Sequence, residues 1–106
     1  MVARFDIYLL NLDPAVGREA KNTRPCVVVS PDELNRNLSS IIVAPISAST
    51  GDYPTRIPVS VLNTERFIIL DQLRTVDKDR LAKKIGEIDK ASQKQIVDRL
   101  QELFAE

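Results

Sequence analysis

The sequence contains no histidine and no tryptophan, and only one cysteine among its 106 residues. Histidine is the usual proton carrier near neutral pH, so acid and base steps must fall to Asp, Glu, Arg, Lys, Tyr or hydroxyl groups. Without histidine we expect no metal site and no cofactor. Cys26 cannot form an internal disulfide, and its place in an apolar run predicts a buried thiol.

Net charge is also lacking, because fifteen basic and fifteen acidic residues cancel. No overall positive field attracts a polyanion, so any contact with nucleic acid must be local. No apolar run has the length of a membrane span, and the first twelve residues lack the charged head and cleavage site of a secretory signal. We therefore expect a cytoplasmic protein without membrane contact.

The common nucleotide and metal motifs are missing as well. No G-x-x-x-x-G-K-[ST], G-x-G-x-x-G, H-E-x-x-H or paired C-x-x-C occurs, so nucleotide hydrolysis, dinucleotide redox chemistry and metal hydrolysis are poorly supported. The length suits one hydrophobic core and is too short for two, which predicts a single domain over residues 1–106.

Short apolar segments bounded by turn residues predict a mainly β protein. The predicted strands cover residues 5–12, 25–30, 40–46, 56–61 and 67–76. The predicted connections are a helical turn at 31–35, a polar loop at 47–54, a turn at 63–66 and a charged connector at 77–84. After Asp89, a predicted N-cap, apolar residues recur at helical spacing as far as Phe104. This pattern predicts a small antiparallel β-barrel with a C-terminal α-helix, not a parallel βαβ sheet.

The polar segment 11–25 lies between the first two predicted strands and is longer than a turn requires. Loops of this length in compact domains are often functional. Arg24 comes directly before a valine-rich strand, which should aim its guanidinium. A fixed guanidinium can bind two phosphate oxygens and stabilise the charge of a phosphorane. The structural alternative is an arginine that pairs with Asp13 or Glu19 and fixes the loop.

Ser47 follows the third predicted strand, as Arg24 precedes the second. Its hydroxyl could position a phosphate or pass a proton, and the structural alternative is a serine that caps its own backbone. If Arg24 and Ser47 lie side by side on neighbouring strands, the pair forms a phosphate site.

Asp71 and Gln72 interrupt an apolar strand, where polar groups are costly unless paired. They could face a groove, where a carboxylate and an amide suit the edges of nucleobases. The alternative is a structural pair between Asp71 and Arg74.

Tyr53 could stack on an exposed base, although packing on its own barrel is the commoner case. Arg80, Lys83 and Lys84 are most simply a solvated face, with phosphate tracking as the alternative.

Seven short motifs stand in order along the chain. They are Asp6-Ile7-Tyr8, Asn11-Leu12-Asp13-Pro14, Gly17-x-Glu19, Arg24-Pro25-x-Val27-Val28-Val29-Ser30, Ala44-Pro45-Ile46-Ser47, Tyr53-Pro54 and Leu70-Asp71-Gln72-x-Arg74-Thr75. Their joint order and spacing, over nearly the whole chain, resemble the MazF/PemK toxins of type II toxin–antitoxin modules.

The resemblance implies an SH3-like (CcdB/PemK-like) barrel with a C-terminal helix, assembled as a homodimer. It implies a toxin that cuts single-stranded RNA, including mRNA, at specific sequences without a metal, and so inhibits translation and growth. The implied partner is a cognate antitoxin whose acidic, initially disordered segment covers the dimer groove.

The resemblance also implies roles for individual residues. The catalytic pair falls on Arg24 and Ser47, and the candidates for a general base are Glu19 and Asp71. The residues expected to contact RNA are Arg18, Lys21, Asn22, Thr23, Thr50, Tyr53, Gln72 and Arg74.

Two residues depart from the family pattern. Phe5 stands where many members carry glycine, and Arg18 stands where serine is usual. Because Arg18 lies in the predicted substrate loop, the cleaved sequence can differ from that of relatives.

The simplest scission without metal or histidine uses the 2′-hydroxyl of the RNA itself, which attacks phosphorus and leaves a 2′,3′-cyclic phosphate and a 5′-hydroxyl. Arg24 would stabilise the phosphorane while Ser47 holds a phosphate oxygen. Two alternatives remain at this point. A CcdB-like toxin that poisons DNA gyrase is disfavoured by the lack of tryptophan, and a silent SH3-like binding module is disfavoured by the low aromatic content.

Overall fold

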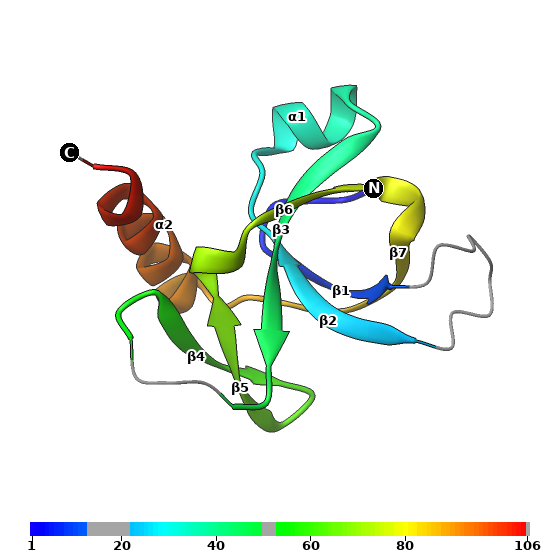
Figure 1. Ribbon diagram of the computed structural model, residues 1–106. Coiled ribbons are helices and arrows are strands. Elements are labelled where there is room, and N and C mark those ends of the chain that lie inside the picture. Colours follow the sequence, from blue (N-terminus) through cyan, green and yellow to red (C-terminus); the bar gives the residue numbers. More distant parts are fainter. Residues whose placement is uncertain (13–21, 50–52, 106) are drawn as a thin grey trace.

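The computed structural model describes residues 1–12, 22–49 and 53–105. Within these residues the chain forms strands, two helices and two short 3₁₀ turns (Figure 1). The elements are β1 (Asp6–Asn11), β2 (Thr23–Val28), α1 (Asp32–Asn37), β3 (Ser40–Ser47), β4 (Arg56–Val61), β5 (Thr64–Ile69), η1 (Leu70–Gln72), β6 (Arg74–Asp77), η2 (Lys78–Arg80), β7 (Leu81–Glu87) and α2 (Lys90–Phe104).

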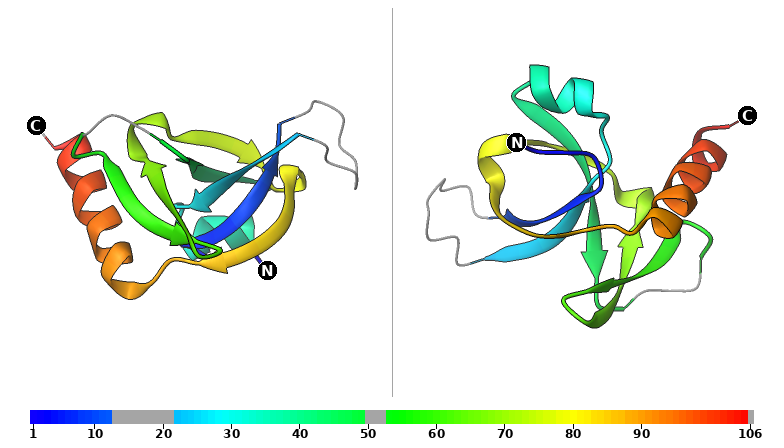
Figure 2. Two further views of the ribbon diagram at one scale, coloured as in Figure 1. Left: turned by 90° about the horizontal axis from the view of Figure 1, so that it is seen from below. Right: turned by 180° about the vertical axis from the view of Figure 1, so that it is seen from behind.

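All strand pairs are antiparallel, in the order β4-β5-β3-β2-β1-β7, with β6 also paired to β3. The sheet curls into half a barrel, and α2 lies beside β4 at one end of it (Figures 1 and 2). The predicted small antiparallel barrel with a C-terminal helix is therefore confirmed. Among the described residues, neither helix has the length and apolarity that a membrane crossing requires.

Strand β3 is central, because it pairs with three other strands. One edge pairs with β2, and the other is shared by β5 near Ile46 and by β6 near Val43. The register along this shared edge shifts by three residues, which is the length of η1. The predicted single strand 67–76 is therefore wrong in one respect: Leu70–Gln72 bulges out of it. Such bulges redirect side chains and are frequent beside active sites.

Two predicted connections also differ from the structure. The turn predicted at 63–66 consists of Leu62 and Asn63 alone, both with positive φ (50° and 64°), which is the geometry of a tight two-residue hairpin turn. The connector predicted at 77–84 contains η2 and the first half of β7, which extends the sheet by pairing with β1. Lys83 and Lys84 are both exposed, so the sequence here lacks the alternation of apolar and polar residues that predicts a strand.

Phe5 adopts the left-handed backbone conformation, with φ of 73°. Its amide donates to Val28 O at 2.7 Å and its carbonyl accepts from Ile88 N at 3.0 Å, so the conformation is fixed from both sides. Glycine reaches this region without strain, whereas phenylalanine does not. The ring of Phe5 packs against the core.

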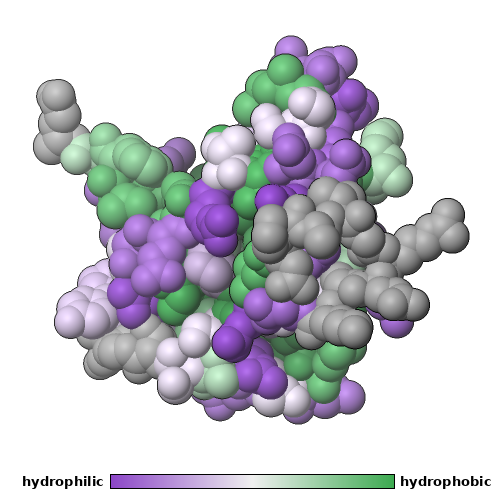
Figure 3. Space-filling model, turned by 45° about the vertical axis from the view of Figure 1, so that its right-hand side comes forward, coloured by the Kyte–Doolittle hydropathy of each residue, from purple (hydrophilic) through white to green (hydrophobic). Residues whose placement is uncertain are grey.

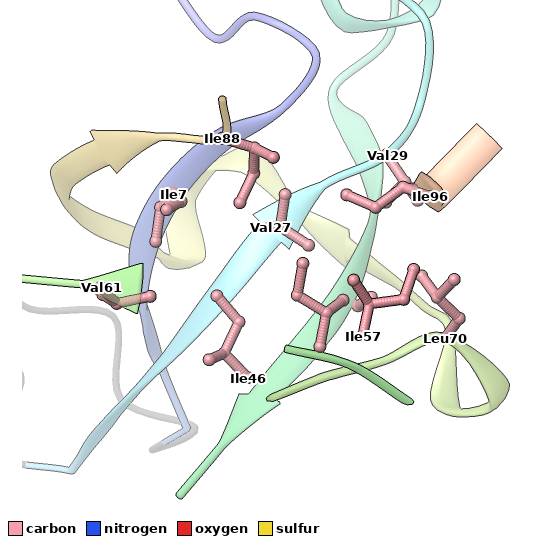
Figure 4. Close-up of a cluster of buried hydrophobic side chains, with 11 residues drawn as sticks. Ile7, Val27, Val29, Ile46, Ile57, Val61, Leu70, Ile88 and Ile96 are labelled. Carbon is pink, nitrogen blue, oxygen red and sulfur yellow. The ribbon is translucent and has the colours of Figure 1, made fainter. Parts of the chain in front are cut away.

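The hydrophobic core lies on both faces of the curled sheet. The larger cluster joins residues of β1, β2, β3 and β4 to Leu70 of η1 and Ile96 of α2, both fully buried (Figure 4). The second cluster lies on the opposite face and includes Leu10, Cys26 and Val43. Helix α2 begins after Asp89, whose carboxylate accepts from Ser92 N at 2.8 Å, so the predicted N-cap is confirmed.

Ser30, at the end of the Arg-Pro motif, has a structural role. Its hydroxyl donates to Asn35 Oδ1 and accepts from Ile42 N at 3.1 Å, while Asn35 Nδ2 donates to Ser30 O at 2.9 Å. Both side chains are buried, so this network fixes α1 on β3. Buried polar groups of this kind are costly to leave unpaired.

Replacing Ser30 with Ala should therefore lower the free energy of unfolding by about 1–3 kcal/mol, because Asn35 and Ile42 N lose a buried partner. Urea denaturation followed by circular dichroism measures this. Ser39→Ala, at an exposed position, is the control and should change stability by less than about 0.5 kcal/mol. Equal effects of the two substitutions would contradict the assigned role.

Candidate functional site

Arg24 lies within β2 and not in the preceding loop, opposite Leu10 of β1. The ladder between β2 and β3 pairs Val28 with Val43, Val27 with Ala44 and Cys26 with Pro45. Arg24 comes two residues before the last of these pairs, and Ser47, which pairs with Phe67 of β5, comes two residues after it. Side chains alternate along strands, so both residues share the face of Cys26 and Pro45. The predicted neighbourhood of Arg24 and Ser47 lies beyond the paired residues of β2 and β3 and stays a prediction.

The exposed Arg24 side chain lines a pocket of about 360 Å³ together with Gln72 and Arg74. The other lining residues are mostly apolar: Leu10, Leu12, Pro25, Cys26, Val43, Pro45 and Leu73. Apolar surface is visible between hydrophilic side chains on one side of the molecule (Figure 3). A mostly apolar pocket with a few convergent polar groups is typical of a ligand site.

A second hollow of about 610 Å³ adjoins the first, since Leu10, Leu12 and Arg74 line both. It also contains Arg80 and Asp77. Arginine side chains therefore occur along both hollows, although the whole chain has no net charge. The sequence predicted a solvated face for Arg80, Lys83 and Lys84. Lys84 differs from this prediction, because its Nζ lies 3.2 Å from the buried carboxylate of Asp6.

The Ser47 hydroxyl is held by its own strand end. Its Oγ donates to Ser49 O at 2.9 Å and accepts from Ser49 N at 3.4 Å. This is the geometry of the structural alternative, a serine that caps its backbone. To hold a phosphate oxygen by donation, the hydroxyl must first release Ser49 O.

Asp71 pairs with Arg56 and not with Arg74, so the predicted structural pair with Arg74 is wrong. Arg56 Nε lies 2.8 Å from Asp71 Oδ1, Arg56 Nη2 lies 2.9 Å from Oδ2, and Thr55 Oγ1 donates to Oδ1 at 2.9 Å. The Arg56 hydrogen bonds, followed by that from Thr55, lower the pKa of Asp71 well below its ordinary value. Both carboxylate oxygens are thus occupied by structural donors.

Thr55 and Arg56 were missed by the sequence reasoning. The register of the β4–β5 hairpin sets Arg56 opposite Ile69, two residues before Asp71. A turn placed at Leu62 and Asn63 would have indicated this proximity, but the turn predicted at 63–66 shifted the pairing. Hairpin register follows from turn length, so the error in the predicted turn prevented a prediction of the Arg56–Asp71 pair.

Tyr53 is 60% exposed and its ring lies against Arg56, with the guanidinium carbon 5.1 Å from the ring centroid. It lines a separate hollow with Gln95 and Arg99 of α2, apart from the Arg24 pocket. The tyrosine therefore packs on its own barrel, as in the commoner alternative, and retains an exposed surface.

Several predicted site residues lie outside the described residues: Arg18, Glu19, Lys21 and Thr50. Asn22 and Thr23 are described, the first exposed and the second half-buried at the start of β2. Within the described ranges, no three or more His, Cys, Asp or Glu side chains are grouped so that they could hold a metal ion.

The protein is a small curled antiparallel sheet with a C-terminal helix. Its arginine pocket lies where β2, β3 and η1 meet. Residues 3–104 match the family model described as PemK-like, MazF-like toxin of type II toxin–antitoxin system. The chain belongs to this family.

Curated relatives agree with the family model. Endoribonuclease EndoA of Bacillus subtilis is 34% identical over 107 aligned positions, covering 95% of this chain and 92% of the relative. Endoribonuclease MazF of Staphylococcus saprophyticus is 31% identical, covering 91% and 85% of the two chains.

Solved structures agree in fold. A mycobacterial endoribonuclease in complex with its cognate antitoxin superposes with a TM-score of 0.82 at 19% identity, covering 96% of this chain and 93% of that one. The MazE–MazF complex of Deinococcus radiodurans gives a TM-score of 0.79 at 19% identity, covering 98% and 95%. At this level of identity the likeness concerns the fold alone.

Cys26 lines the Arg24 pocket but is poorly suited to nucleophilic chemistry. The residue is 1% exposed, and burial raises the pKa of its thiol to about 12. A thiol reacts as the thiolate, which is scarce at such a pKa. The predicted buried thiol is confirmed.

Cys26 should therefore react with a thiol reagent at pH 8 at least about a hundredfold more slowly in the native protein than in 8 M urea. The release of thionitrobenzoate from Ellman's reagent measures both rates. Comparable rates in the folded and unfolded protein would contradict the burial of the thiol.

Proposed function

We propose that this chain is a toxin endoribonuclease that cleaves single-stranded RNA at specific sequences, with Arg24 as its main catalytic group. The main supporting observation is the position of Arg24, which is fixed in β2 opposite Leu10 and lines one pocket with Gln72 and Arg74. Membership of the toxin family and the endoribonuclease names of its relatives support it.

The 2′-hydroxyl of the RNA is the proposed nucleophile. It attacks the adjacent phosphorus and displaces the 5′-oxygen, which leaves a 2′,3′-cyclic phosphate and a 5′-hydroxyl. Arg24 stabilises the charge on the phosphorane oxygens, and the Ser47 hydroxyl orients one of them. Arginine hardly ever loses its proton, so charge stabilisation is its proposed role and not acid catalysis.

Glu19 is the proposed candidate for the general base. Asp71 is less suited to this role than the sequence alone suggested, because Arg56 and Thr55 occupy its oxygens and its pKa is lowered. A base with a strongly lowered pKa accepts a proton weakly.

The two adjoining hollows are the proposed path of the RNA. Arg24, Arg74 and Arg80 provide local positive charge for phosphates, and Gln72 provides an amide for a base edge. A few phosphate contacts together with base contacts suit a protein with no net charge. This arrangement favours sequence selectivity over general binding of nucleic acid.

The proposed partners are a second copy of the chain and a cognate antitoxin. The relatives from mycobacteria and Deinococcus radiodurans were solved with antitoxins. An acidic, initially disordered antitoxin segment would bind the same arginines that are proposed to bind the RNA phosphates, and would fold as it binds.

RNA should be cleaved in the presence of EDTA, whereas DNA of the same sequence should stay intact, because DNA has the phosphates but lacks the nucleophile. Gel analysis of matched oligonucleotides measures both reactions. Cleavage of the DNA, or RNA cleavage only after a metal is added, would contradict the proposed mechanism.

Arg24→Ala should lower RNA cleavage by at least about a hundredfold, because a single donor to a developing oxyanion commonly contributes that much. Single-turnover rates measure the loss, and circular dichroism verifies the fold. Arg36→Ala, at an exposed position of α1, is the matched control and should keep the wild-type rate. Retained activity of Arg24→Ala would remove Arg24 from the site.

A further inference from the structure

The three-residue turn η1 presents Gln72 to the Arg24 pocket, yet it is too short to be rigid by itself. Short 3₁₀ turns have poor hydrogen-bond geometry and depend on their surroundings. An amide that reads a base edge must be held within a fraction of an ångström to discriminate. The turn therefore needs external fixation.

The inner half of η1 is fixed by the core. Leu70 is fully buried and belongs to the same cluster as Ile96 of α2 (Figure 4). The amide of Leu70 also donates to Thr55 O at 3.0 Å. These contacts fix the start of the turn but not its outer residues, Asp71 and Gln72, which are both exposed.

The outer half of η1 is fixed by the first residues of β4. Arg56 donates hydrogen bonds to both carboxylate oxygens of Asp71, at 2.8 and 2.9 Å, and Thr55 donates a third. The Arg56 side chain is only 18% exposed, and the ring of Tyr53 lies over its guanidinium. A planar fork on a carboxylate fixes orientation as well as distance, which a lysine ammonium cannot do.

We infer that Arg56 is a positioning residue that holds the η1 turn through Asp71 and thereby sets which nucleobase Gln72 accepts beside Arg24. The inference rests on the proposed function. Arg56 does not line the Arg24 pocket and acts through Asp71. Its loss should therefore relax base selectivity while leaving the charge stabilisation by Arg24 in place.

The test begins with a random-sequence RNA pool cut by the wild-type protein, with sequencing of the new 5′ ends. A recurrent motif defines the cognate RNA, and single-base variants of it are then assayed for kcat/KM. Failure of the wild type to cut the pool would count against the proposed function itself, before Arg56 is examined.

Arg56→Gln should lower the selectivity between cognate RNA and at least one single-base variant by about tenfold, the scale of one good base contact. Its rate at saturating cognate RNA should stay within about threefold of wild type, because the reacting phosphate keeps Arg24. Arg56→Lys keeps the charge without the fork and should fall between the two. Arg66→Gln, on the neighbouring strand β5, is the matched control and should keep wild-type selectivity.

A double-mutant cycle with Asp71→Asn tests whether Arg56 acts through Asp71. The double variant should lose no more selectivity than the stronger single variant, because the two residues form one contact. Losses that multiply would overturn the inference. So would unchanged selectivity of Arg56→Gln or, if that variant does not fold, of Arg56→Lys.

Discussion

The three-residue bulge at Leu70–Gln72 is the constraint on which the rest of the site depends. Strand β3 offers one edge to both β5 and β6, and the two ladders differ in register by the length of the bulge. The extra residues leave the sheet beside Pro45 and the Arg24 pocket. A regular strand would direct these side chains alternately to the two faces, whereas the bulge brings Gln72 to the pocket.

Around this bulge, positive charge is concentrated locally in a chain that is neutral overall. Arg24 and Arg74 line the first pocket, and the adjoining hollow shares Arg74 and adds Arg80. Asp71 does not cancel this charge, because its carboxylate is occupied by Arg56 and Thr55. In the proposed function these arginines would bind phosphate at a few fixed points, which favours selection of an RNA sequence over general attraction to polyanions.

Much of the fold was predictable from the sequence, because hydrophobic periodicity and turn residues are local signals. The strand 56–61, the Asp89 cap and the helix that follows it agree with the structure. Three features were not predictable: the bulge within 67–76, the strand β7, and the Arg56–Asp71 pair. Each depends on strand register, a non-local property that hairpin length and neighbouring strands determine. Arg24 and Gln72 were predicted as site residues, and the structure brings them into one pocket, whereas the loop residues predicted with them lie outside the described residues.

In the proposed reaction Arg24 stabilises the transition state and the RNA supplies its own nucleophile. Once the cleaved bond is mapped, an RNA with a single 2′-deoxy nucleotide on the 5′ side of that bond tests the role of the 2′-hydroxyl. We expect this RNA to bind with nearly unchanged affinity and to stay intact at that bond, while the all-ribose RNA yields a 2′,3′-cyclic phosphate. Cleavage of the deoxy-substituted RNA at the same bond would contradict the proposed reaction.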